Sequence, residues 1–130
     1  SFSRTGLIAQ LEFEGFSITD ATYGVDVLSV DWNIQAAQSA ESYLDLTSFS
    51  RSGLIDQLSS EYGGLFTVEE ATYGVDVLNA DWNAQAARSA QEYLNFDSFS
   101  RAGLIDQLSS EYGEGFTLEQ ATYGVNAVGL

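Results

Sequence analysis

Acidic side chains are the groups in this sequence most able to do chemistry. The chain holds 19 Asp and Glu against four basic residues, has no His and no Cys, and carries a net charge of -15. Without His and Cys there is no imidazole base and no thiolate nucleophile, and zinc would have to be held by carboxylates alone, which is not expected. Asp26 with Asp31, and Asp76 with Asp81, lack the alternating acids, the Gly and the bidentate Glu of a calcium loop. We therefore predict solvated acidic faces, no catalytic residue, no metal site and no cofactor, so the chain is not expected to be an enzyme.

The negative charge also limits the partners. It repels nucleic-acid phosphates, whose binding needs Lys and Arg to displace counterions, and it disfavours anionic membranes. No apolar run reaches the roughly 18 residues of a membrane span. We therefore expect no nucleic-acid partner and no direct membrane insertion by this segment, whereas the charge would suit high solubility, a basic protein partner or a salty medium.

One sequence motif occurs three times in the chain and defines its repeats. Ser-Phe-Ser-Arg-x-Gly-Leu-Ile begins at Ser1, Ser48 and Ser98. A phrase copied in this way predicts a repeat array. The expected division is a partial repeat over residues 1–28, which lacks its first helix, and full repeats over 29–78 and 79–130.

The partial repeat predicts an open end. Its helix pair lacks the helix that would cover Leu7, Ile8 and Leu11, so a neighbouring repeat or another chain is expected to cover them. The chain starts at Ser1, inside this repeat, which indicates a piece processed or excised from a longer protein.

Each full repeat is expected to form three helices. In the last repeat the first helix covers residues 81–94 and the second covers about 100–112. The third begins at Thr117, with Gln120 completing a capping box. The predicted fold class is all-α, with tandem three-helix units, helix-turn-helix-like helix pairs and about eight helices in all.

The core is predicted from the helical spacing of apolar residues. The two tryptophans are expected to anchor it, because a small three-helix unit has little else to bury, although a Trp can also be an interface hot spot. Ser89 and Glu92 are expected on the water-facing side of the first helix. The predicted inward-facing residues are Trp32, Trp82, Leu54, Ile55, Leu58, Leu104, Ile105, Leu108, Tyr112, Leu118, Ala121, Val125 and Val128.

Three of the four basic residues, Arg4, Arg51 and Arg101, share one register of the repeat. One interpretation is a row of cations that binds a partner or an anion. The interpretation we favour is structural: an Arg near a helix N-terminus opposes the helix dipole, so a carboxylate should pair with it, such as Asp45, Asp97 or a Glu of the preceding helix.

The phrase Ala-Thr-Tyr-Gly-Val also recurs, with its glycines predicted inside a helix at positions 24, 74 and 124. A mid-helix Gly costs up to about 1 kcal/mol relative to Ala. Its repetition predicts close approach by another helix. Tyr23, Tyr73 and Tyr123 are then candidates for an exposed partner-binding row, with core packing as the alternative.

Longer motifs carry a resemblance to the host cell surface-exposed lipoprotein (Ltp-like) repeat family. They are Asp81-Trp82-Asn83, Ser89-Ala90, Tyr93-Leu94, Phe99-Ser100-Arg101, Gly103-Leu104-Ile105, Gln107-Leu108 and Phe116-Thr117. The resemblance implies a small helical domain in tandem copies. It also implies an extracellular or cell-surface location on Gram-positive cells, with a lipid anchor in a segment outside this sequence. Prophage-encoded members are associated with superinfection exclusion, through binding of a phage injection protein that blocks DNA entry.

Two functions follow as hypotheses. The first is a non-catalytic cell-surface module that binds a phage injection protein. The alternative is a structural repeat whose open ends dock head to tail, so that copies of the chain form a homo-oligomer, a filament or a surface layer. DNA reading is disfavoured, because the last helix pair carries Asp106, Glu111, Glu114 and Glu119 against Arg101 alone.

Overall fold

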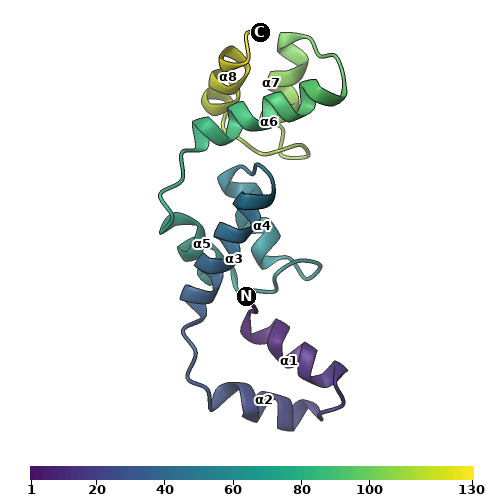
Figure 1. Cartoon of the computed structure of the whole chain (residues 1–130), viewed down its shortest axis with the longest axis vertical. Coiled ribbons are helices and arrows are strands. Elements are labelled where there is room, and N and C mark those ends of the chain that lie inside the picture. Colours follow the sequence, from purple (N-terminus) through teal and green to yellow (C-terminus); the bar gives the residue numbers. More distant parts are fainter. The chain divides into compact units, whose positions relative to one another are not determined.

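The computed structural model describes all 130 residues as eight α-helices with no strand (Figure 1). The all-α prediction and the number of helices are confirmed. The helices are α1 (Arg4–Phe13), α2 (Ile18–Asp26), α3 (Trp32–Leu46), α4 (Arg51–Ser59), α5 (Val68–Asp76), α6 (Trp82–Phe96), α7 (Arg101–Ser109) and α8 (Leu118–Ala127).

The chain divides into two compact units whose limits differ from those of the repeats. Unit 1 consists of Ser1–Ser42 with Ile55–Leu78, and unit 2 of Tyr43–Leu54 with Asn79–Leu130. Both limits fall inside helices, in α3 and in α4. The first turn of α4 therefore belongs to the same unit as α6, α7 and α8.

Short polar side chains start most of the helices. Ser100 accepts a hydrogen bond from the backbone N–H of Gly103 and so acts as the N-cap of α7. Thr117 and Gln120 form the predicted capping box at the start of α8, and Thr67 with Glu70 forms another at α5. These caps satisfy backbone N–H groups that would otherwise have no partner.

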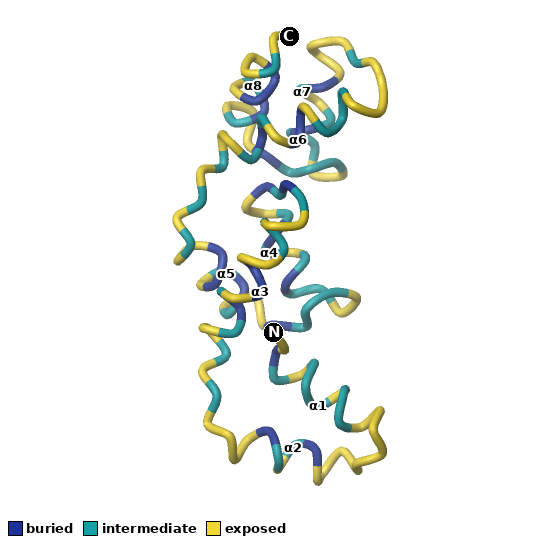
Figure 2. The backbone as a smooth tube through the Cα atoms, in the orientation of Figure 1, coloured by how far each residue is buried: buried dark blue, intermediate teal, exposed yellow.

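Small side chains dominate the core of unit 2, in which α6 packs against α7 and α8. Figure 2 shows the buried positions where these helices face one another. Tyr93, Leu94, Phe99, Ile105 and Val128 lie half-buried around the core. The fully buried side chains are Ala86, Ala90, Leu104, Leu108, Phe116, Ala121 and Val125.

Unit 1 repeats this arrangement around α3 and α5. Ala36 and Ala40 of α3 are buried, as are Ala71 and Val75 of α5. A Cβ atom at Gly74 would lie 2.7 Å from the carbonyl carbon of Ala36. The predicted close approach of a second helix is therefore found at this glycine, and only a residue without a side chain fits there.

Several residues predicted to be inward-facing lie elsewhere. Trp32 and Trp82 are half-buried rather than core residues, because each stands at the first position of its helix while alanines hold the inner contact. Ile55 and Ile105 are also half-buried, whereas the predicted core residues Leu54, Leu58, Leu104 and Leu108 are fully buried. The isoleucines lie about 100° farther round their helices than the preceding leucines, at the rim of the core.

Tyr112 and Leu118 were also predicted on the inner face, and both predictions are wrong. Tyr112 is 93% exposed, because α7 ends at Ser109 and the following turn points the ring into solvent. Leu118 is 65% exposed at the first position of α8. The prediction for Ser89 is wrong in the opposite sense. This residue was expected to face water, but it is only 2% exposed.

Candidate protein-binding site

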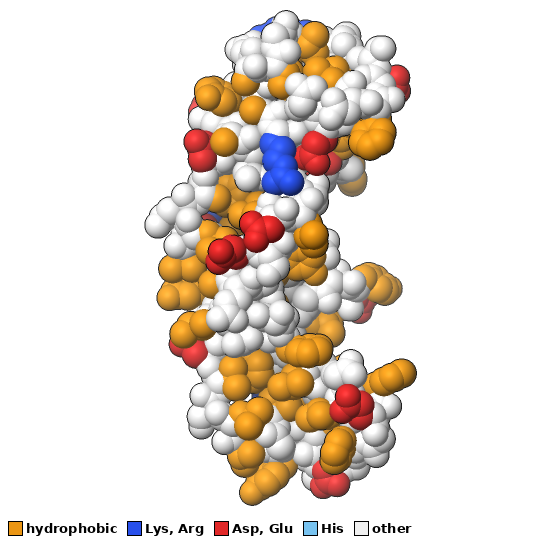
Figure 3. Space-filling model, in the orientation of Figure 1, with side chains coloured by type: hydrophobic (Ala, Val, Ile, Leu, Met, Phe, Trp, Pro, Cys, Tyr) orange, Lys and Arg blue, Asp and Glu red, His pale blue; other side chains and the backbone are white.

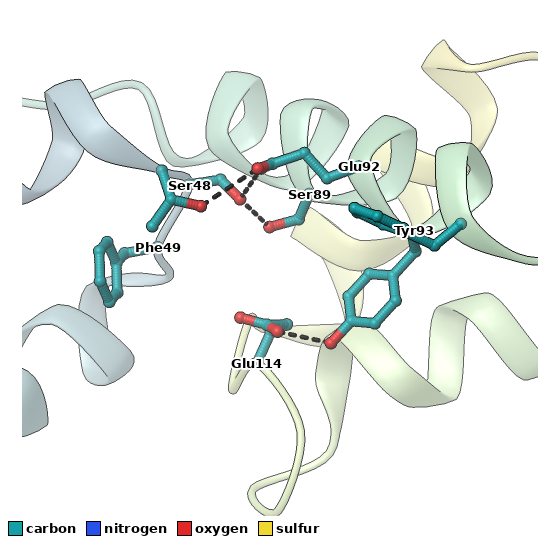
Figure 4. Close-up of a pocket in the computed structure, with 8 residues that line it drawn as sticks. Ser48, Phe49, Ser89, Glu92, Tyr93 and Glu114 are labelled. Atoms are coloured by element: carbon teal, nitrogen blue, oxygen red, sulfur yellow. Dashed lines mark hydrogen bonds between the residues drawn. The ribbon is translucent and has the colours of Figure 1, made fainter.

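A cavity of about 320 Å³ lies within unit 2, where three segments meet (Figure 4). The segments are the linker between α3 and α4, the second half of α6, and the loop between α7 and α8. The lining residues are Thr47, Ser48, Phe49, Ser89, Glu92, Tyr93, Phe96 and Glu114.

One wall of the cavity is a hydrogen-bond network centred on Ser48. Its hydroxyl donates to Glu92 Oε1 at 2.5 Å and lies 2.5 Å from the hydroxyl of Ser89. Because Ser48 has a single hydroxyl proton and donates it to the carboxylate, Ser89 is the donor in the second bond. Thr47 donates to the other carboxylate oxygen of Glu92 at 3.1 Å. The network thus holds the Glu92 carboxylate in one orientation toward the cavity.

The opposite wall is held by Tyr93. Its hydroxyl donates to Glu114 Oε1 at 2.6 Å and accepts from Nε2 of Gln107 at 3.2 Å. Its ring meets Phe99 edge to face, with centroids 5.7 Å apart. Burial raises the pKa of Tyr93, and the hydrogen bond to the Glu114 carboxylate raises it further. Tyr93 therefore stays a neutral donor at physiological pH.

Serines in and next to the recurring Ser-Phe-Ser motif form hydrogen bonds between one repeat and the next. Ser50 donates to the backbone carbonyl of Glu114, and Ser52 donates to that of Gly115 at 2.9 Å. Unit 1 has a corresponding contact, in which Ser39 of α3 donates to the carbonyl of Ser1 at 3.0 Å. Sequence reasoning found the phrase and missed this role. The signal was the small polar residue that recurs at Ser39 and Ser89 inside an alanine stripe.

The cavity suits a positively charged group. Glu92 and Glu114 supply two carboxylates, although Nε of Arg88 already lies 3.9 Å from Glu92 Oε1. Phe49, Tyr93 and Phe96 supply aromatic surface, of which Phe96 is 92% exposed. Carboxylates and aromatic faces together attract ammonium and guanidinium groups. The serine hydroxyls are already engaged and no imidazole is present, so the lining offers no activated nucleophile.

The three arginines of the shared register differ in their contacts. Arg4 pairs with Asp26 through two hydrogen bonds of 2.8 and 3.0 Å. The hydrogen bond from Arg4 lowers the pKa of Asp26, and the same bond raises the pKa of Arg4. Arg51 is also engaged. Arg101 is exposed and forms no ion pair, since Asn126 stands where the partial repeat has Asp26.

The structural interpretation therefore holds for Arg4, although its partner is neither of the acids proposed from the sequence. Asp45 and Asp97 form no ion pair with any arginine. The acid that does pair lies at the far end of the next helix, a position that local spacing cannot reveal. Arg101 alone keeps the character of a free partner-binding cation.

The three tyrosines proposed as contact residues point outward. Tyr23 is 71% exposed, Tyr73 49% and Tyr123 52%. Core packing is thereby excluded for all three. No ring contact joins them, because the aromatic pairs of this structure are Tyr43 with Phe49 and Tyr93 with Phe99. Each is a separate exposed ring on α2, α5 or α8.

A family model described as host cell surface-exposed lipoprotein matches residues 31–78 and again residues 81–128. This chain belongs to the host cell surface-exposed lipoprotein family. Membership in this lipoprotein family places it at the cell surface. None of its helices combines the length and the apolar character needed to cross a membrane.

One solved structure similar to this member of the lipoprotein family is that of Ltp, a superinfection exclusion protein from the Streptococcus thermophilus temperate phage TP-J34. The TM-score is 0.66 at 29% sequence identity, and the match covers 75% of this chain and 95% of the Ltp chain. A search of curated proteins found no match. The helical repeat predicted from the sequence resemblance is thus confirmed by family and by structure.

Proposed function

We propose that this chain is a non-catalytic protein-binding module that excludes superinfecting phages at the cell surface. The observation that carries the proposal is the similarity to Ltp, a superinfection exclusion protein, over 95% of the Ltp chain. Exclusion by a surface protein requires binding of a phage component and no chemistry. Neither the family nor the Ltp structure favours the alternative of a filament or surface layer.

The partner we propose is a basic segment of a phage protein that reaches the cell surface during injection. Two properties of this chain support a basic partner. The net charge is -15, which steers cationic proteins toward the surface. The unit 2 cavity presents Glu92 and Glu114 beside the exposed ring of Phe96, a combination that attracts Lys and Arg side chains.

The test displays this chain on a phage-sensitive Streptococcus thermophilus strain through a lipoprotein anchor. Phage adsorption and plaque formation are then measured for a panel of phages. We expect adsorption to stay unchanged while plaque formation falls in proportion to the number of displayed molecules, as stoichiometric binding requires. Unchanged plaque formation with every phage, at display levels confirmed by antibody labelling, would overturn the proposal.

A pair of variants assigns the effect to the cavity. Glu92→Gln with Glu114→Gln removes both carboxylate charges and keeps one acceptor oxygen at each position, so at position 92 only one of the hydroxyls of Thr47 and Ser48 retains its acceptor. Glu61→Gln with Glu111→Gln removes the same charge from exposed sites elsewhere. We expect the first double variant to lose protection and the second to retain it. Equal loss in both would show that overall charge, rather than the cavity, binds the partner.

A further inference from the structure

One carboxylate oxygen of the unit 2 cavity has no partner in the chain. The carboxylate of Glu114 accepts the hydroxyl proton of Tyr93 at Oε1, over 2.6 Å, and forms no other hydrogen bond or ion pair. Glu92 differs, because a hydroxyl donates to each of its oxygens and Nε of Arg88 lies 3.9 Å from Oε1. Glu114 is therefore the carboxylate of the cavity with the greater remaining capacity for a ligand.

The corresponding positions of unit 1 carry no acid. In the preceding repeat Ser42 stands at the position of Glu92, and Gly64 at that of Glu114. The Ser-Phe-Ser motif is nevertheless held in unit 1, since Ser39 donates to the first carbonyl of the motif at 3.0 Å. A repeat can therefore hold this motif without either acid, which favours a ligand-binding role for the two acids of unit 2.

The net negative charge of the chain does not distinguish one cation from another. Figure 3 shows acidic side chains scattered over the face in view, and such a distributed charge attracts lysine and arginine alike. A cavity with fixed acceptors can distinguish them, because the two cations differ in shape. The guanidinium group is planar and presents five N–H donors, whereas the ammonium group is a compact and strongly hydrated point charge.

We propose that the unit 2 cavity selects an arginine side chain of the partner over a lysine, with Glu114 as the anchoring carboxylate. This inference rests on the proposed function, in which a basic segment of the partner occupies the same cavity. The guanidinium group donates to the open oxygen of Glu114, which lies across the cavity from Glu92 (Figure 4). Its flat face lies on the exposed ring of Phe96, a contact that favours arginine over lysine.

The chain already uses a guanidinium group in a similar way next to the cavity. Nη1 of Arg88 donates to the carbonyl of Leu44 at 2.8 Å, while its Nε lies 3.9 Å from Glu92 Oε1. One guanidinium group thus reaches acceptors of two helices, α3 and α6, through different nitrogens. A single ammonium nitrogen has no such reach, since all three of its donors leave from one atom.

The probes are N-acetyl-arginine amide and N-acetyl-lysine amide, each titrated into the complete 130-residue chain labelled with nitrogen-15. The backbone amide signals of Ser89, Glu92 and Glu114 report on the cavity, and those of Ser39 and Ser42 report on unit 1 in the same spectrum. We expect saturable shifts at the cavity only, with binding of the arginine probe about tenfold tighter than that of the lysine probe. Equal binding of the two probes, equal shifts in both units, or no saturable shift would overturn the proposal.

Glu114→Gln is the decisive variant. Its amide oxygen still accepts the hydroxyl proton of Tyr93, so this wall of the cavity should persist, but an NH₂ group replaces the open oxygen. Glu111→Gln removes the same charge from an exposed position of the same loop and is the matched control. We expect the arginine probe to bind Glu114→Gln about tenfold more weakly and to bind Glu111→Gln unchanged. Equal affinity for Glu114→Gln and the unmodified chain would also overturn the proposal.

The selectivity of the cavity and the exclusion of phages can fail separately, because no phage component enters the titration. Protection in the plaque assay without a preference for the arginine probe would overturn the selectivity and leave the exclusion of phages standing. Selective binding of the arginine probe without any protection would do the reverse.

Discussion

Gly124 of α8 lies against the backbone of Ala86 in α6, where a Cβ atom at Gly124 would be 2.6 Å from the carbonyl carbon of Ala86. Gly24, the same position of the partial repeat, meets no atom within 4 Å. One sequence position thus has opposite surroundings in two copies of the repeat. The difference allows packing and helix propensity to be measured separately at matched sites.

Gly124→Ala should destabilise the protein, and Gly24→Ala should not. At Gly124 the added methyl group meets backbone, so overpacking should cost about 1–3 kcal/mol. At Gly24 the same change gains up to about 1 kcal/mol of helix propensity with no contact to disturb it. Urea unfolding of both variants followed by circular dichroism measures the two effects. A loss of equal size at both positions would contradict the structural difference.

Ser48→Ala should destabilise unit 2, because the buried Ser48 is bonded to the buried Ser89 and to the partly exposed Glu92. Removal of its hydroxyl leaves both partners short of a hydrogen bond, at a cost of about 1–3 kcal/mol. Ser98→Ala is the matched control: Ser98 begins the same phrase in the last repeat and is exposed. We expect a lower melting temperature for Ser48→Ala alone, measured by differential scanning calorimetry.

The fold could be predicted from the sequence because equivalent residues of each repeat mark the ends of the helices and their contacts. Capping residues such as Thr117 mark helix starts, and a recurring mid-helix glycine such as Gly74 marks a close helix contact. The cavity could not be predicted in the same way. Its walls come from the α3–α4 linker, α6 and the α7–α8 loop, and helical spacing placed Ser89 and Glu92 simply on a wet surface. A contact between segments distant in sequence, such as that of Ser48 with Glu92, produces no periodic pattern of residue types from which it could be predicted.

The two tryptophans were predicted as core residues from their residue type alone, and that prediction is wrong. A buried Trp would cost about 3–5 kcal/mol on truncation to Ala, but Trp82 is only half-buried. We therefore expect Trp82→Ala to destabilise the protein less than Leu108→Ala, which removes a fully buried side chain and should cost about 2–5 kcal/mol. Chemical denaturation of the two variants compares them directly. A larger loss for Trp82→Ala would restore the tryptophan as the anchor of the core.

The Arg4–Asp26 pair should show in acid titration. Arg4 lowers the pKa of Asp26 in the folded protein, whereas the pKa of an Asp in an unfolded chain is about 3.9. A lowered carboxyl pKa stabilises the fold above the unfolded value, and this contribution is lost as pH falls through the folded pKa. Carbon-13 NMR of the Asp26 carboxyl should therefore report a depressed pKa that returns toward normal in Arg4→Gln. An unchanged titration in Arg4→Gln would show that the pair does not persist in solution.

Moderate salt should stabilise this chain. With a net charge of -15 and only four basic residues, NaCl screens much more repulsion than attraction. Near 0.1 M the Debye length falls to about 10 Å, which weakens repulsion between acids on different helices. We expect the melting temperature to rise from low to moderate NaCl. A variant with Glu61→Gln, Asp106→Asn and Glu111→Gln, all at exposed positions, should show a smaller rise because it carries less repulsion to screen. A melting temperature that falls with NaCl would mean that the few ion pairs, such as Arg4 with Asp26, outweigh the repulsion.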